Sequence, residues 1–298
     1  MNVTVRRLCG SFAAEVRGLD LSVELDAGPR SQLIDLLGEH LVLVVRGGAS
    51  AGRDEQERLA DAFGERRPLP TLRFLGELEA TRSVTADQLQ VTARSAGRAE
   101  LAEQLGFAAE FDRWHTDSSF TAELPRAAVL RAEVLPPVGG DTYFVDMCAA
   151  YERLSPTVRG WIDGLSAYHA SPPYYKAAID IDRYGDDAAA RFDAEFPPRL
   201  HPMVVEHPTS RRRALFVNPV YTVGVEGLSP LESSGLLRML FTHAISAEHI
   251  YRHHWEPGDL LVWDELVNLH LAPTDFAPHA RRVVRVLAGT VVPTAPTR

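Results

Sequence analysis

The stretch Arg113-Trp114-His115-Thr116-Asp117-Ser118-Ser119-Phe120 decides how the rest of the chain is interpreted. It places His115 and Asp117 two positions apart, and on an extended chain such residues project from the same face. The pair can therefore grip one metal ion, provided that a third ligand comes from elsewhere in the fold. Spacing alone leaves open the alternative of a hydrogen-bonded pair in the core.

A second pair with the same spacing, His254 and Glu256, precedes the turn-like Pro257-Gly258-Asp259. A turn between a polar segment and an apolar run is typical of the solvated end of a strand. We therefore interpret this pair as surface residues and keep His115 and Asp117 as the metal candidates.

The surrounding sequence is rich in short apolar runs bounded by Pro, Gly or Asn, with several helical segments between them. Many strands with irregular connections favour a sandwich or barrel over a parallel βαβ sheet. We expect an α+β fold with a mainly β core, in one domain over residues 1–298, with lid or active-site loops near 66–113 and 170–195. The expected strands include Leu41–Val45, Ala127–Val134, Thr142–Val145, Arg213–Val217, Asp259–Trp263 and Arg282–Val292; the expected helices include Ser31–His40, Asp54–Phe63, Ala149–Leu154, Pro156–Gly164 and Pro230–Ala247.

Composition excludes several classes of function. The chain has 298 residues with 31 Lys plus Arg against 40 Asp plus Glu, a net charge of -9 that disfavours a nucleic-acid partner. Lys176 is the sole lysine, so there is no Walker-type Gly-Lys-Ser/Thr loop. Cys9 and Cys148 are too few and too isolated for a disulfide framework or a Cys-based zinc site. Without a run of about 18 apolar residues, we expect no membrane span and a cytoplasmic setting.

Several blocks in order along the chain resemble the taurine/2,4-dichlorophenoxyacetate dioxygenase family of Fe(II)- and 2-oxoglutarate-dependent oxygenases. An ordered series of blocks is far more specific than any one motif. The matching blocks are Gly18-Leu19-Asp20-Leu21-Ser22, Phe63-Gly64-Glu65, Trp114–Phe120, Leu135–Thr142, Leu200-His201-Pro202, Ala214–Asn218, and Gly258–Asp264 followed by His270.

The resemblance implies a double-stranded β-helix, or jelly roll, flanked by helices. It implies that His115, Asp117 and His270 bind Fe(II) and leave positions open for 2-oxoglutarate and O2. No catalytic residue is expected beyond this metal centre. The implied reaction is oxidation, by default hydroxylation, of a substrate C–H bond, with release of succinate and CO2. Family members are often homo-oligomers, so an oligomer is possible here.

The resemblance also assigns the residues around the metal. Arg285, with Thr142, matches the clamp on the far carboxylate of 2-oxoglutarate, where the planar guanidinium suits a carboxylate. Arg281, four residues earlier on the same strand face, is expected to contact a substrate carboxylate or other anion. Tyr174, Tyr175 and Tyr221 match stretches that line the family's substrate pocket.

Two other functions are weighed against this one. A zinc-dependent β-barrel hydrolase or isomerase could use the same three ligands, but it would not need Arg285 and Thr142 as a clamp. A non-catalytic binding module would need neither the complete ligand set nor the clamp. The sequence also departs from the taurine enzymes, because Arg66-Arg67-Pro68 replaces the histidines that bind sulfonate there, which makes taurine a poor candidate.

Overall fold

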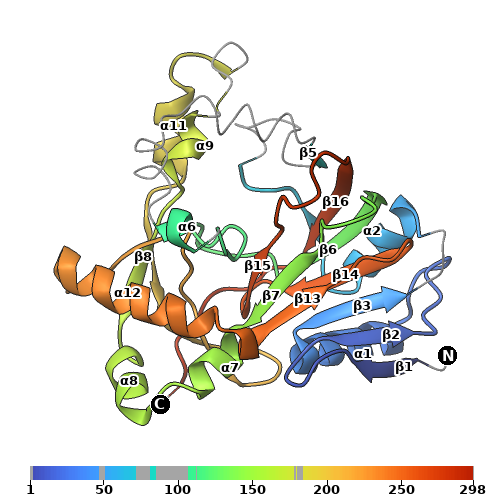
Figure 1. Cartoon of the computed structure of the whole chain (residues 1–298), viewed down its shortest axis with the longest axis horizontal. Coiled ribbons are helices and arrows are strands. Elements are labelled where there is room, and N and C mark those ends of the chain that lie inside the picture. Colours follow the sequence, from blue (N-terminus) through green and yellow to red (C-terminus); the bar gives the residue numbers. More distant parts are fainter. Residues whose placement is uncertain are drawn as a thin grey trace.

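An eight-stranded sheet dominates the computed structural model, which describes residues 3–46, 51–71, 81–84, 107–111, 113–177, 179 and 184–297 (Figure 1). Its strands follow the order β1-β2-β3-β14-β6-β16-β4, and β5 pairs with β16 beside this path. Only β2 and β3 run parallel among these described pairs. The strand bounds are β1 Thr4–Arg7, β2 Ala14–Arg17, β3 Val42–Arg46, β4 Arg66–Arg67, β5 Thr81–Val84, β6 Ala127–Val134, β14 Asp259–Asp264 and β16 Arg281–Ala288.

Three smaller sheets complete the β structure, in the orders β13-β7-β15, β12-β8-β9 and β10-β11, all antiparallel. The first of them matters most here because β15 carries His270. The bounds are β7 Thr142–Asp146, β8 Ser166–His169, β9 Arg199–Pro202, β10 Val204–Glu206, β11 Arg213–Leu215, β12 Thr222–Val225, β13 Ile250–His253 and β15 Asn268–Leu271.

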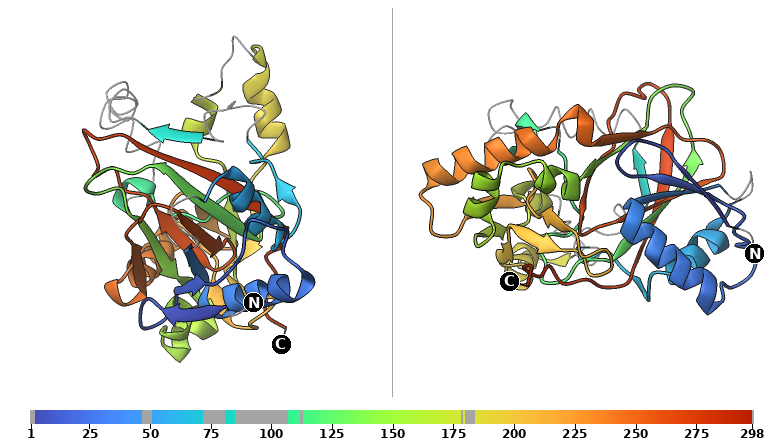
Figure 2. Two further views of the ribbon diagram at one scale, coloured as in Figure 1. Left: turned by 90° about the vertical axis from the view of Figure 1, so that its right-hand side faces the viewer. Right: turned by 90° about the horizontal axis from the view of Figure 1, so that it is seen from below.

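Helices cover the sheets at both ends of the molecule. Figures 1 and 2 show α1 beside the N-terminal strands, with α8 and α12 at the opposite end and α9 and α11 together at the top of Figure 1. The helix bounds are α1 Ala27–His40, α2 Arg53–Asp61, α6 Phe107–Glu110, α7 Met147–Glu152, α8 Pro156–Ile162, α9 Pro173–Ala177, α11 Ala188–Glu195 and α12 Pro230–Ala244, with a 3₁₀ turn at Ala247–His249. Within the described ranges, none of these helices combines the length and the hydropathy that crossing a bilayer requires.

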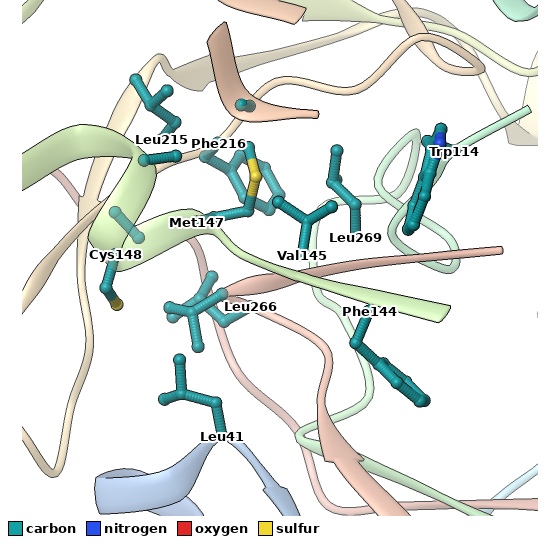
Figure 3. Close-up of a cluster of buried hydrophobic side chains, with 14 of the residues drawn as sticks. Leu41, Trp114, Phe144, Val145, Met147, Cys148, Leu215, Phe216, Leu266 and Leu269 are labelled. Carbon is teal, nitrogen blue, oxygen red and sulfur yellow. The ribbon is translucent and has the colours of Figure 1, made fainter. Parts of the chain in front are cut away.

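The central strands β3 and β14 of the large sheet are buried on both faces, which explains their nearly continuous apolar sequences. Along β3, Leu43 and Val45 pack against α1 and α2, whereas Val42 and Val44 join the main core on the other face. Successive side chains of a strand point to opposite faces, so one apolar run feeds two cores. Figure 3 shows part of the main core, which contains Phe144 and Val145 of β7 together with Trp114.

The predicted α+β class with a mainly β core is confirmed, and β6 has the predicted bounds. The described parts of the segments expected as loops hold regular elements: β4 and β5 pair with β16, and α9 and α11 lie within 170–195. Much of 66–113 lies outside the described residues.

Candidate metal centre

Two histidines far apart in sequence are brought together by a short backbone pairing. His115 and His270 form an antiparallel bridge, in which the His115 N–H donates to the His270 carbonyl at 3.2 Å and the His270 N–H returns a bond at 2.8 Å. Their rings lie with centroids 4.3 Å apart. On either side of this bridge, Trp114 and Leu269 are anchored in the main core (Figure 3). The core therefore places both rings without any local motif joining them.

Asp117 completes the predicted trio. One potential ligand atom from each of His115, Asp117 and His270 lies within 4.8 Å of the others. The His115 Nε2 atom is 3.5 Å from Asp117 Oδ1, and the His270 Nε2 atom is 3.9 Å from Asp117 Oδ2. Two imidazoles and a carboxylate gathered in this way can bind one face of a metal ion.

The hydrogen bonds of His115 indicate what belongs between these atoms. His115 Nδ1 lies 2.9 Å from the Arg113 carbonyl oxygen, which can only accept, so this nitrogen carries a hydrogen. In the neutral ring the lone pair is then on Nε2, and it faces the Asp117 carboxylate, another acceptor. Facing lone pairs need a cation between them, and a carbonyl bound to the outer nitrogen is the usual support of a metal-binding histidine. The donor set therefore fits Fe(II).

Asp117 is buried between a cation and a second acid. Arg285 donates from Nη1 to Asp117 Oδ2, and the Asp117 N–H donates to Glu265 Oε2 at 3.0 Å. Burial raises the pKa of Asp117, but the charge of Arg285 beside it acts in the opposite direction, and that pKa lies well below its usual range. Burial and the nearby Asp117 charge raise the pKa of Glu265 well above its usual range. Of these two neighbouring acids, Asp117 is therefore the one that stays ionised, as a metal-binding carboxylate must.

Thr142 lies beside Arg281. The Thr142 Oγ1 atom accepts from Arg281 Nη2 at 3.3 Å and from Trp255 Nε1 at 3.0 Å. Arg281 also donates from Nε to the Gly140 carbonyl at 2.8 Å. Gly140 has φ +73°, and a Cβ there would lie 2.9 Å from the Arg281 side chain, so only glycine suits this approach. From the sequence we expected Thr142 to share a 2-oxoglutarate clamp with Arg285. In the structure the Thr142 hydroxyl is hydrogen-bonded to Arg281 instead.

Of the predicted tyrosines, Tyr221 lies directly beside the metal centre. The Tyr221 ring lies edge-on to the His115 ring at 6.2 Å, and its hydroxyl is 2.7 Å from that of Tyr175. Phe120 packs on both tyrosines, and we call Phe120, Tyr175 and Tyr221 the aromatic wall. Tyr174 packs edge-on against Tyr175 from outside this group. Burial, with Tyr175 nearby, raises the pKa of Tyr221 well above its usual range, so its hydroxyl stays protonated.

The second candidate pair, His254 and Glu256, does not belong to this centre. The His254 side chain is 79% exposed and bonds to Asp141, while the exposed Glu256 pairs with Arg46, so the interpretation as a solvated strand end is confirmed. Sequence reasoning missed Glu265, although an acid directly after the buried β14 strand was a usable signal. It also missed Asn218, whose side chain is 1% exposed and bonds to Ser119.

Comparison with known proteins identifies relatives over nearly the whole chain. A family model described as "Taurine catabolism dioxygenase TauD, TfdA family" matches residues 4–288. An alpha-ketoglutarate-dependent sulfate ester dioxygenase of Pseudomonas putida is 31% identical over 294 residues, covering 98% of this chain and 91% of the relative. The alpha-ketoglutarate-dependent 2,4-dichlorophenoxyacetate dioxygenase of Cupriavidus pinatubonensis is 35% identical over 282 residues, covering 91% and 92%.

A solved structure agrees with these matches. The structure titled "AAD-2 in complex with Mn(II) and N-oxalylglycine" superimposes with a TM-score of 0.73 at 27% identity, and the match covers 100% of both chains. The likeness therefore includes the whole arrangement of sheets and helices as well as the sequence blocks.

Proposed function

The chain belongs to the taurine catabolism dioxygenase TauD, TfdA family, and we propose that it hydroxylates a C–H bond of a small anionic substrate. As in that family, it is a dioxygenase that uses Fe(II), 2-oxoglutarate and O2. The observation that carries the proposal is the gathering of one ligand atom each from His115, Asp117 and His270 within 4.8 Å, directly beside an arginine. The zinc hydrolase or isomerase is not retained, because the family relatives are alpha-ketoglutarate-dependent dioxygenases.

The three ligands would hold the iron by one face. When bound, iron and 2-oxoglutarate supply oxidative decarboxylation coupled to substrate oxidation, with succinate and CO2 as products. The Arg113 carbonyl keeps the His115 hydrogen on Nδ1, so Nε2 is available as a ligand. Glu265 accepts from the Asp117 N–H and so orients the turn that carries Asp117.

We assign the far carboxylate of 2-oxoglutarate to Arg281 and Thr142. The Thr142 hydroxyl already accepts two hydrogen bonds, which leaves its own hydrogen to donate to a carboxylate. Arg281 is 7% exposed, and a buried guanidinium is stabilised by an anionic partner. This assignment replaces the pairing of Thr142 with Arg285 that the resemblance implied.

Arg285 then faces the substrate. It contacts Asp117, so it lies next to the metal centre, where the reacting part of a substrate must sit. Its charge favours an anionic substrate, in line with the sulfate ester and the 2,4-dichlorophenoxyacetate in the names of two relatives. The aromatic wall would hold the apolar part of the substrate, with the paired hydroxyls of Tyr175 and Tyr221 as its polar contact.

We further propose that residues 1–298 form a single catalytic domain built on a double-stranded β-helix. Supporting this, β15 of one sheet carries His270, and β16 of the other carries both arginines. Residues from two sheets that face one small site are what such a fold provides.

The test is anaerobic addition of Fe(II) and 2-oxoglutarate to metal-free protein, watching for a weak visible charge-transfer band. We expect a band in the wild type, none in His115→Ala, a weaker one in Arg281→Ala at the same 2-oxoglutarate concentration, and an undiminished one in Arg285→Ala. Tight zinc retention with no band would refute the proposed function. A band weakened by Arg285→Ala and not by Arg281→Ala would restore the original assignment of the two arginines.

A further inference from the structure

A buried polar network lies between the metal-binding turn and the aromatic wall. Its centre is Asn218, whose side-chain Nδ2 donates to Ser119 Oγ at 2.9 Å and whose Oδ1 accepts from the Tyr221 N–H at 2.8 Å. Ser119 stands two residues after Asp117. One amide side chain thus bonds at one end to the turn of a metal ligand and at the other end to the backbone of Tyr221.

The direction of both Asn218 side-chain bonds is determined by elementary donor and acceptor chemistry. The Tyr221 N–H can only donate, so the Asn218 oxygen must face it and the nitrogen must face Ser119. The Ser119 Oγ atom also lies 3.0 Å from His169 Nδ1, and the Thr222 Oγ1 atom lies 3.4 Å from His169 Nε2. Burial lowers the pKa of His169 to about 3, so this ring is neutral and has one nitrogen that donates and one that accepts.

The network is shielded from water and anchored in the sheet β12-β8-β9. Ser119 and His169 are both 0% exposed, and Asn218 is 1% exposed. The Asn218 N–H donates to Thr222 Oγ1 at 2.8 Å, and Thr222 pairs with His169 across β12 and β8. A fully bonded buried network of this kind holds its members in one arrangement.

We propose that Asn218 is a positioning residue that couples metal binding at His115 and Asp117 to the placement of Tyr221. The proposal rests on the proposed function for the identity of the metal centre. A metal ion that draws His115 and Asp117 together orders the turn that follows them, and Ser119 is part of that turn. Asn218 transmits this order to Tyr221, which stands edge-on to His115. The aromatic wall is therefore held in position when the metal is bound.

The test is hydrogen–deuterium exchange of the 218–223 segment, with and without Mn(II) plus 2-oxoglutarate under argon. In the wild type we expect these probes to slow exchange there by about three- to tenfold, the range for one buried hydrogen bond. In Asn218→Ala we expect that response to disappear, while the Mn(II) affinity stays within about threefold because no ligand is changed. A merely structural bond would raise exchange equally with and without metal.

Two further variants sharpen the test. Ser119→Ala keeps the bond from Tyr221 to Asn218 but cuts the link to the metal turn, so the metal response should vanish while the metal-free exchange stays slow; it also serves if Asn218→Ala does not fold. Ser233→Ala is the matched control, because it removes a buried bond to the Val225 N–H at the other end of β12 and should keep the response.

Three outcomes would overturn the inference. They are a metal response retained in Asn218→Ala, retained in Ser119→Ala, or lost equally in Ser233→Ala. The wild type separates this failure from that of the proposed function. Protection of residues 115–120 without protection of 218–223 refutes only the coupling, whereas no protection of either segment refutes the metal centre as well.

Discussion

The metal ligands and the aromatic wall meet at His115, yet they rest on different parts of the fold. His115 and His270 are joined to each other by backbone bonds, and their neighbours Trp114 and Leu269 pack in the main core. The aromatic wall belongs to a separate small cluster, in which Phe192 of α11 and Phe196 pack under Phe120 and Tyr221. Small clusters on irregular segments open more easily than sheet cores.

This contrast indicates that the metal ligands and the aromatic wall have different roles. The metal ligands, which must be held within tenths of an ångström, are supported by paired backbone, while the wall that we propose contacts the substrate rests on segments that can change without disturbing the core. Asn218, which is 1% exposed, bonds to Ser119 near the metal ligands and to the Tyr221 N–H in the aromatic wall, and so links the two regions. The following predictions test this difference in roles, from the largest expected effect to the smallest.

The largest effect should come from His115→Ala. Loss of even a supporting partner of a metal ligand costs about 10- to 100-fold in affinity, so loss of the ligand itself should lower Fe(II) affinity by more than about 100-fold. Anaerobic titration with Fe(II) measures it. His254→Ala is the matched control, since His254 has the same spacing to an acid but is exposed, and an equal loss there would contradict the assignment.

Arg281→Ala should come next. Truncating one member of a buried charge pair costs about 2 kcal/mol or more, so the KM for 2-oxoglutarate should rise by about 30-fold. The adjacent Arg282 is about half exposed and pairs with Glu133, so Arg282→Ala should change this KM by less than about threefold. Similar KM values for the two variants would remove Arg281 from the 2-oxoglutarate site.

His169 should make the free energy of unfolding depend on pH in the acidic range. Its folded pKa of about 3 lies below the ordinary 6.5, so below pH 6.5 the unfolded chain binds a proton that the folded chain does not. Stability therefore falls as the pH drops from 6.5 toward 3, by about 1 kcal/mol between pH 7 and 5.5 from this group.

Urea unfolding at the two pH values measures this loss in the wild type and in His169→Gln. Other histidines contribute equally to both proteins, so the difference between them isolates His169. We expect the variant to lose about 1 kcal/mol less than the wild type. Equal losses would show that His169 is not kept neutral in the folded protein.

The smallest effect should come from Tyr221→Phe. It removes the hydroxyl that pairs with Tyr175 but keeps the ring against His115. We expect the KM for the organic substrate to rise by about threefold, the loss of one weak hydrogen bond, with the KM for 2-oxoglutarate unchanged. A change in the KM for 2-oxoglutarate instead would show that the aromatic wall and the metal centre do not act independently.

Local patterns predicted much of the main core. The apolar run at 127–134 became β6 with the predicted bounds, and the runs at Leu41–Val45 and Asp259–Trp263 became β3 and β14 within one residue at each end. Strands β3 and β14 and the first half of β6 are buried on both faces, so their hydrophobicity is a strong local signal. The strands β8, β9 and β15 were missed, because each has four residues and includes a histidine.

The segment around Tyr174 shows why the wall was harder to predict. It was expected as a loop, yet α9 and α11 form there, with Phe192 buried against residues from other parts of the chain. Helices of five and eight residues are too short to be stable alone, so their formation depends on tertiary packing that no local pattern displays.

The sequence by itself determined which residues could bind the metal, because the histidine and carboxylate types and the ordered blocks around them are chemical facts of the chain. It also determined that Arg281 and Arg285 share a strand face, since side chains alternate along a strand. Only the tertiary structure decided which arginine stands beside Thr142 and which beside Asp117, and that Asn218 joins Ser119 to Tyr221. Those partners come from other strands and turns, and what lies opposite a side chain is determined by packing rather than by its own neighbours in sequence.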